Sequence, residues 1–350
     1  MNLRYLQSLS SEISQIQIIG KSVELYGAIN HVMGLIRSGS DLKLLVLHYD
    51  DDFVSRIEET ELIEESGCSP EIQTNRLRVH GDRSIEPVKG LYSGCRKLLI
   101  GNYEFTSDTT EHSRCNPQDW RALTIFTEFL KHGWNPEGLE DRNIEHLFLA
   151  TIHLEGEYHS IPEVGKSPVL EFDYYPDYEE FLVEEPLRLS FHSEYPYALQ
   201  FKNKQTSEEH QVLIHAAYPY DIWKEIMKTF DEPSLLEGLS AEQIAHAKAE
   251  FEVQLAAICP KGMHFPMIEY ECEQELSLQF HSSAWLEAKP VHTHSSIGFL
   301  VKPEHERASS GLPMKAAVIQ EPISPDTDSI EVELFKCIRQ IQREKVTLVD

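Results

Sequence analysis

The sequence contains no long apolar run, and this absence argues against export and membrane insertion. Its first residues, MNLRYLQSLSSEISQ, lack the uninterrupted apolar stretch of a signal peptide. No later segment approaches the ~20 consecutive apolar residues that a membrane-spanning helix needs. The six cysteines are scattered without close pairs, which is typical of reduced thiols rather than of a disulfide framework. We therefore expect a cytoplasmic protein that does not bind membranes.

Several catalytic motifs are also missing. The sequence contains no GxSxG nucleophile elbow, no GxGxxG dinucleotide loop, no HExxH and no paired CxxC. Gly20, Lys21 and Ser22 match the end of a phosphate-binding loop, but the preceding SQIQII contains no glycine. A loop without glycine cannot wrap its backbone amides around phosphates. The sequence therefore argues against the enzyme families that these motifs define and leaves other enzymes open.

Lysine and arginine are scarce relative to acidic residues. The chain has 31 basic and 58 acidic residues, a formal net charge of −27. Residues 151–200 hold eleven carboxylates against only Lys166 and Arg188. Such a surface repels phosphate backbones, so we expect no nucleic-acid binding, whereas a basic protein or a divalent cation would suit it. The alternative is a charged surface that serves solubility alone.

What is present predicts a globular α+β fold. Hydrophobic residues make up 41% of the 350 residues, enough for a sizeable core, and the length favours two domains. Residues 22–37 show helical spacing, whereas residues 42–49 (LKLLVLHY) have the pattern of a buried strand. Residues 116–134 predict a helix, and from about residue 145 strands dominate, interrupted by helices that begin at Asp221 and Ser240. The expected organisation is a mixed α/β N-terminal domain at 1–140, a larger, mainly antiparallel β region with packed helices at 141–302, a loop or linker at 303–328, and a C-terminal helix and tail at 329–350.

The stretch EFDYYPDYEEFLVEEP (171–186) places five aromatic rings among seven carboxylates, with no basic residue. If it is helical from Asp177, its apolar side chains form an inward stripe and its glutamates face water, as in any amphipathic element. The alternative is an acidic, aromatic surface that docks a basic protein, with tyrosines as anchors and carboxylates that steer the partner. That surface would consist of Tyr174, Tyr175, Tyr178, Glu179, Glu180, Glu184 and Glu185.

A second candidate site is centred on VHTHSS. His292 and His294 are alternate residues, so both imidazoles would point to one side of an extended chain, as a metal site requires. With His281 they would supply three ligands for a divalent metal such as zinc. The alternative is a polar loop that happens to hold two histidines. The residues that would complete a metal site are Glu269, Glu271, Glu273 and Glu287.

These observations favour a soluble acidic interaction protein of the inhibitor, immunity or regulatory type, which binds a basic partner. The second hypothesis is a metal-dependent hydrolase centred on the His-x-His pair. The sequence does not decide whether the protein is an enzyme.

Overall fold

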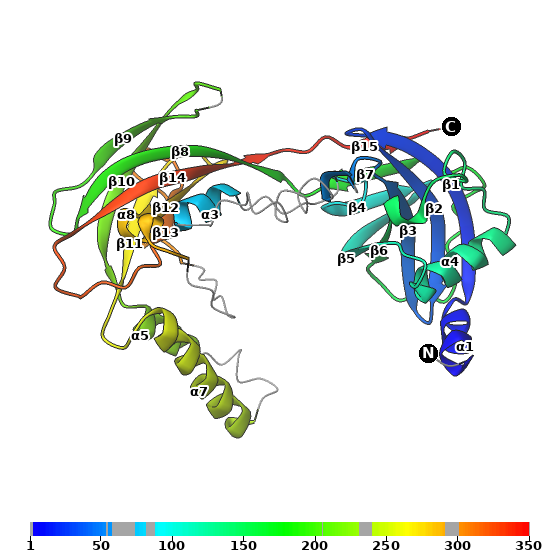
Figure 1. Ribbon diagram of the computed structural model, residues 1–350, viewed down its shortest axis with the longest axis horizontal. Coiled ribbons are helices and arrows are strands. Elements are labelled where there is room, and N and C mark those ends of the chain that lie inside the picture. Colours follow the sequence, from blue (N-terminus) through cyan, green and yellow to red (C-terminus); the bar gives the residue numbers. More distant parts are fainter. Residues whose placement is uncertain are drawn as a thin grey trace. The chain divides into compact units, whose positions relative to one another are not determined.

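The computed structural model describes residues 3–53, 55–57, 74–81, 88–204, 206–230, 240–290 and 301–349. The chain forms two compact units, and each is built from separated stretches of sequence (Figure 1). Unit 1 contains residues 1–69, 83–177 and 342–350, and unit 2 contains residues 70–82 and 178–341. Among the described residues, no helix is long and apolar enough to cross a membrane.

Unit 1 is an eight-stranded antiparallel sheet that curls into a nearly closed barrel. Each neighbouring pair of its strands is antiparallel. In spatial order, the strands are β1 (Gln15–Leu25), β2 (Ala28–Ser38), β3 (Asp41–Tyr49), β6 (Leu147–Leu154), β5 (Tyr103–Arg114), β4 (Cys95–Ile100), β7 (Leu170–Tyr174) and β15 (Val346–Leu348). The helices of this unit include α1 (Leu3–Glu12) and α4 (Trp120–Lys131), with a short 3-10 turn at Ile144–His146.

Strand β3 shows why unit 1 holds together. Leu44 and Val46 join the apolar cluster shared by all eight strands, whereas Leu45 and Leu47 pack in a second cluster with Phe129 of α4. Because successive side chains of a strand point to opposite faces, β3 is buried on both sides. The strand prediction for residues 42–49 is confirmed.

Unit 2 consists of two sheets that share one apolar core. The four-stranded sheet has the order β13 (Met314–Val318), β11 (Phe265–Glu271), β10 (Glu209–Tyr220) and β9 (Tyr197–Lys202). The three-stranded sheet has the order β12 (Leu276–Ser282), β14 (Ser329–Ile341) and β8 (Asp177–Ser190). Its described helices are α3 (Asn75–Gly81), α5 (Ile222–Thr229), α7 (Ala241–Ile258) and α8 (Ser283–Glu287).

The α+β prediction is wrong, because the structure is mostly antiparallel β, with 45% strand against 20% helix. Residues 22–37, expected to be helical, belong instead to the β1–β2 hairpin. Tyr26 and Gly27 make its two-residue turn, both with positive φ (54° and 83°), the conformation that tight hairpins require. Since β2 is buried on both faces, its apolar residues do not alternate, and their spacing imitates that of a helix.

Two further helix predictions are wrong. The C-terminal segment 329–350 contains strands β14 and β15, and the segment from Asp177 is strand β8. In β8, Phe181 and Val183 are core residues, which is the two-residue period of a strand. The helices expected at Asp221 and Ser240 are confirmed, and Ser240 forms a capping box with Gln243.

Adjacent tyrosines in β7 and just beyond it provide a test of this packing. Tyr174 is fully buried in the core of unit 1, whereas the Tyr175 side chain is 54% exposed. We expect Tyr174→Ala to lower the free energy of unfolding by about 3–5 kcal/mol because it leaves a cavity. Tyr175→Ala should change it by less than about 0.5 kcal/mol. Urea unfolding of both variants measures the difference, and equal losses would contradict the assignment of Tyr174 to the core.

Candidate functional site

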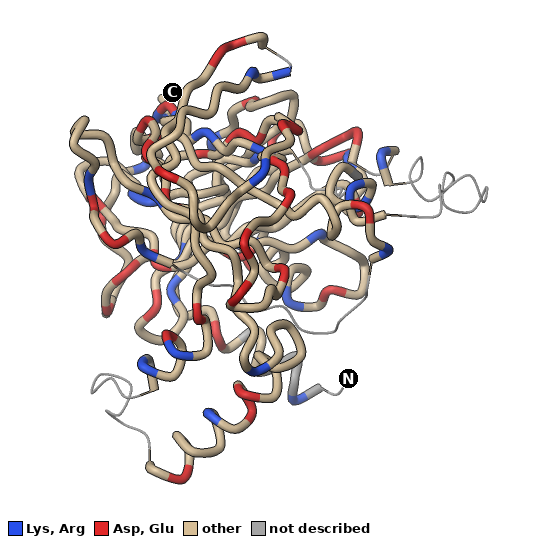
Figure 2. Tube along the Cα trace, turned by 90° about the vertical axis from the view of Figure 1, so that its left-hand side faces the viewer, with Lys and Arg blue, Asp and Glu red and all other residues tan. Residues whose placement is uncertain are grey.

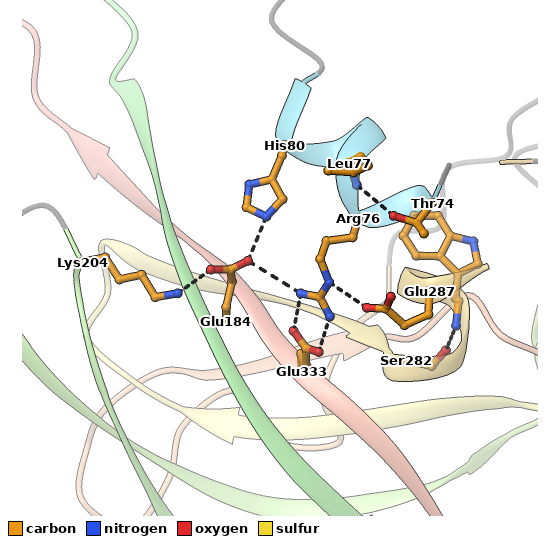
Figure 3. A network of polar contacts seen from close by, with 10 residues as sticks. Thr74, Arg76, Leu77, His80, Glu184, Lys204, Ser282, Glu287 and Glu333 are labelled. Carbon is orange, nitrogen blue, oxygen red and sulfur yellow. Dashed lines mark hydrogen bonds and ion pairs between the residues drawn. The ribbon is translucent and has the colours of Figure 1, made fainter. Parts of the chain in front are cut away.

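A network of charged side chains gathers on one face of unit 2, around Arg76 of α3 (Figure 3). The Arg76 guanidinium makes a bidentate contact with Glu333 of β14, in which Nη1 donates to Oε2 over 2.8 Å. Its Nε donates to Glu287 Oε1 over 2.8 Å, and Nη1 lies 3.6 Å from Glu184 Oε1. These bonds, chiefly the one to Glu333, raise the pKa of Arg76 above its ordinary value. A guanidinium that donates two parallel hydrogen bonds recognises carboxylates specifically.

Glu184 of β8 joins three basic side chains. It accepts hydrogen bonds from Lys204 and from His80 Nε2, the latter over 2.8 Å, in addition to its contact with Arg76. The hydrogen bond from Lys204 is the main cause that lowers the pKa of Glu184. Its φ of 54° lies in the left-handed region, which a glutamate adopts only at a cost. Backbone strain of this kind tends to occur where a side chain must be aimed at a particular place.

Beneath the charges lies an aromatic surface. A bulge in the β12–β14 ladder leaves Phe335 without a paired residue on β12, since Gln279 pairs with Lys336 and Phe280 pairs with Leu334. The Phe335 ring is fully buried, yet it lies outside the apolar core of the sandwich. Arg76 stands over this ring at 5.9 Å, and the rings of His80 and His281 meet it edge-on at 5.3 and 5.5 Å.

Helix α3 is positioned by Asn75 at its first turn. The Asn75 backbone N–H donates to Ala288 O over 2.8 Å, and its side-chain amide donates to Trp285 O over 2.9 Å. Helix α8, which carries Trp285 and Glu287, is itself capped by Ser282, whose hydroxyl accepts from Trp285 N. Arg78 of α3 stands over the Trp285 ring at 5.9 Å. A basic helix therefore lies on an acidic and aromatic face.

Of the three predicted metal ligands, only His281 lies within the described residues; His292 and His294 lie outside them. The His281 ring stacks on Trp285 at 4.7 Å, and burial lowers its pKa to about 4. No group of three His, Cys, Asp or Glu side chains in the described ranges is arranged to hold a metal ion. The metal-dependent hydrolase therefore stays a prediction.

Three of the glutamates that were expected to complete a metal site have other partners. Glu269 accepts from the Tyr218 hydroxyl over 2.8 Å, and Glu271 lies 3.1 Å from His215 Nε2. Glu287 binds Arg76.

The predicted docking residues are divided between the two units. Tyr174 and Tyr175 belong to unit 1, the first buried in its core and the second exposed. In unit 2, Tyr178 is 62% exposed, and Glu180 binds Lys336 over 2.9 Å. Glu184 belongs to the Arg76 network, whereas Glu179 and Glu185 are exposed on β8.

Arg76, Glu333 and Phe335 are not among the residues predicted from the sequence. The only signal was the basic run NRLRVHG (75–81), a cationic segment in a chain of strongly negative charge. The partners of Arg76 lie more than 100 residues away in sequence, so spacing gave no indication of them.

The chain matches no family model, and neither the curated proteins nor the solved structures contain a significant match to it. A function for this chain is therefore inferred from its own residues and their arrangement.

The depressed pKa of Glu184 gives a pH test of the network. A carboxyl whose pKa is lower in the folded state contributes stability that is complete above the ordinary value of 4.5 and is lost as the pH falls through the folded-state value. We expect Glu184→Gln to remove about 1–3 kcal/mol of stability at pH 7 and to make stability depend less on pH below 4.5.

Glu185→Gln is the matched control, because Glu185 is the exposed neighbour on the same strand. It should change stability by less than about 0.5 kcal/mol at pH 7. Denaturant unfolding at pH 7 and at pH 3 measures both effects. Identical behaviour of the two variants would show that the network does not stabilise unit 2.

Proposed function

We propose that this protein is an acidic interaction protein, of the inhibitor, immunity or regulatory type, whose function is to bind a basic partner. One observation carries the proposal. The acidic face of unit 2 binds a basic segment of its own chain, helix α3. Arg76 of this helix forms ion pairs with Glu184, Glu287 and Glu333. Its guanidinium lies over the Phe335 ring. Carboxylates around an aromatic floor are the chemistry that recognises arginine.

Exposed residues of β8 extend the same chemistry to a partner. Tyr178 supplies a large exposed ring, and Glu179 and Glu185 supply exposed carboxylates on the strand that also carries Glu184. Tyrosine anchors at interfaces because its ring buries much area at little entropic cost. We therefore place the contact with the partner on β8 of unit 2.

The charge of the whole chain supports fast association with a cationic protein. Acidic and basic residues are interspersed along the trace in Figure 2 rather than gathered in one segment. Unit 1 carries 29 acidic against 16 basic residues, and unit 2 carries 29 against 15, so both are negative. Many basic side chains are already held in ion pairs within the chain, among them Lys204, Lys336 and Arg339. Long-range attraction then favours basic partners and disfavours nucleic acid and anionic membranes.

We also infer a cytoplasmic location. The described cysteines are all free and buried, namely Cys95, Cys115, Cys259, Cys272 and Cys337. Free buried thiols are typical of proteins in a reducing compartment.

A labelled peptide of about ten arginines tests whether β8 receives a cation. We expect Glu179→Gln combined with Glu185→Gln to weaken its binding to the full chain at least about tenfold, because two charge-assisted contacts are lost. Binding by the unmodified chain should weaken strongly between about 20 and about 300 mM NaCl, since salt screens exposed charges. Fluorescence anisotropy measures both effects.

The charge-matched control is Glu242→Gln combined with Glu250→Gln, two exposed positions on α7 of the same unit. This control should change the affinity less than about twofold. Equal weakening in both double variants would mean that the peptide responds to net charge alone. An affinity that does not depend on salt would contradict the electrostatic basis of the proposal.

A further inference from the structure

Unit 1 contains a cavity of about 280 Å³ on the outside of its barrel. Residues of β2, β3, β5 and β6 form its floor, and residues of α1 and α4, two helices that contact each other, form its roof. This volume is far larger than the ~30 Å³ share of one water molecule and lies just below the range of about 300–1,000 Å³ for drug-sized ligands. The cavity therefore suits a small metabolite.

The side chains of the floor point away from the barrel interior. On β3, Leu44 belongs to the interior cluster, so Lys43 and Leu45 point to the opposite, outer face. Leu45 pairs with Thr151 of β6, which pairs in turn with Glu111 of β5, and paired residues lie on the same side of a sheet. Lys43, Thr151 and Glu111 therefore share one face with Leu45, and all four line the cavity.

Lys43 is a buried cation without a counter-ion. It is only 9% exposed, and within the described part of the chain no hydrogen bond or ion pair reaches its side chain. Its ammonium group is nonetheless open to the cavity, since it is not one of the unpartnered polar atoms that solvent cannot reach. A buried charge of this kind is costly. An anionic group in the cavity would remove that cost by binding Lys43.

Negative charge also faces the cavity. Glu12, Glu111 and Asp119 line it, and none of them lies within ion-pair distance of Lys43. Asp119 caps α4, where it accepts from the Ala122 N–H over 3.1 Å. The side chain of Glu111 is 60% exposed and lies 3.7 Å from His153 Nε2, beyond hydrogen-bond distance, so its carboxylate is available to a ligand.

The apolar part of the lining is aliphatic. Leu45 and Leu149 come from the sheet, and Leu9 and Ile125 come from the helices. Three of these side chains, Leu45, Leu149 and Ile125, belong to the buried cluster that joins α4 to the sheet. Walls of this kind favour a ligand with an aliphatic side chain, which they would remove from water.

We propose that this cavity binds a small aliphatic α-amino acid in its zwitterionic form. The carboxylate of the ligand binds Lys43, its ammonium group donates to Glu111, and its side chain packs against Leu45 and Leu149. A zwitterion has no net charge, so the field of a chain with net charge −27 does not repel it, as it would repel a simple carboxylic acid. This inference is independent of the proposed docking of a basic protein, which rests on residues of unit 2, and the two proposals can fail separately.

L-Leucine is the probe, and two related compounds each lack one of its charges. 3-Methylbutylammonium lacks the carboxylate, and 4-methylpentanoate lacks the ammonium group. Isothermal titration at pH 7 should give one leucine site per chain, with each analogue bound at least about tenfold more weakly, because it loses one charge-assisted contact. Equal affinity for leucine and either analogue would overturn the proposal, as would the absence of saturable leucine binding up to about 10 mM.

The variants assign each charge of the ligand to its residue. Lys43→Met removes the ammonium group and keeps an unbranched apolar side chain, and it should reduce the preference for leucine over 3-methylbutylammonium to less than about twofold. Glu111→Gln should reduce the preference for leucine over 4-methylpentanoate in the same way. Lys166→Met, at an exposed position of the same unit, is the control and should keep both preferences. A preference that survives Lys43→Met would contradict the role given to Lys43.

Thermal unfolding provides a second measurement on the same variants. Lys43→Met should not lower the unfolding midpoint, because it replaces an unpaired buried charge by an apolar side chain. Leucine should raise the midpoint of the unmodified chain and leave that of Lys43→Met unchanged, since a ligand stabilises only the protein that binds it. If Lys43→Met did not fold, the three ligands compared on the unmodified chain would still decide.

Discussion

The guanidinium of Arg76 is the contact on which the acidic face of unit 2 depends. It covers the Phe335 ring, which the β14 bulge leaves outside the sandwich core, and it neutralises Glu333, whose side chain is only 12% exposed. Without Arg76, three carboxylates would face one another beside an uncovered aromatic ring. Removing one partner of a partly buried ion pair costs more free energy than the intact pair contributes to stability. The contact also anchors α3 (Asn75–Gly81), which lies in the sequence between two stretches of unit 1.

This network indicates that some of the acidic residues do more than keep the protein soluble. Had the acidic residues served solubility alone, we would expect them on exposed positions without defined partners. Glu184 instead adopts a φ of 54° and binds basic groups from two separate parts of the chain, His80 of α3 and Lys204 after β9. Part of the acidity of the chain thus forms a surface that can hold a guanidinium with defined geometry, which is why a basic partner is the function best supported.

The sequence predicted the local elements better than it predicted the architecture. Buried β3 and the Ser240 capping box have strong local signals, since continuous apolar runs and caps are encoded within a few residues. Residues 22–37 were misread because a strand buried on both faces loses its alternation. Local patterns could not predict the Arg76 network, because Glu184, Glu287 and Glu333 each lie more than 100 residues from Arg76 in the sequence. Contacts of this kind depend on tertiary structure, which no local pattern carries.

His281 is an uncharged member of the aromatic surface beneath Arg76. Its ring stacks on Trp285 and meets Phe335 edge-on, so it belongs to the aromatic surface beneath Arg76. Burial is the main cause that lowers its pKa to about 4; the nearby Lys336 acts in the same direction, and Glu333 opposes both. At neutral pH the ring is therefore uncharged. A protonated ring would place a second cation against the same Phe335 ring that Arg76 covers. The neutral imidazole therefore packs against Phe335 without repelling the guanidinium of Arg76.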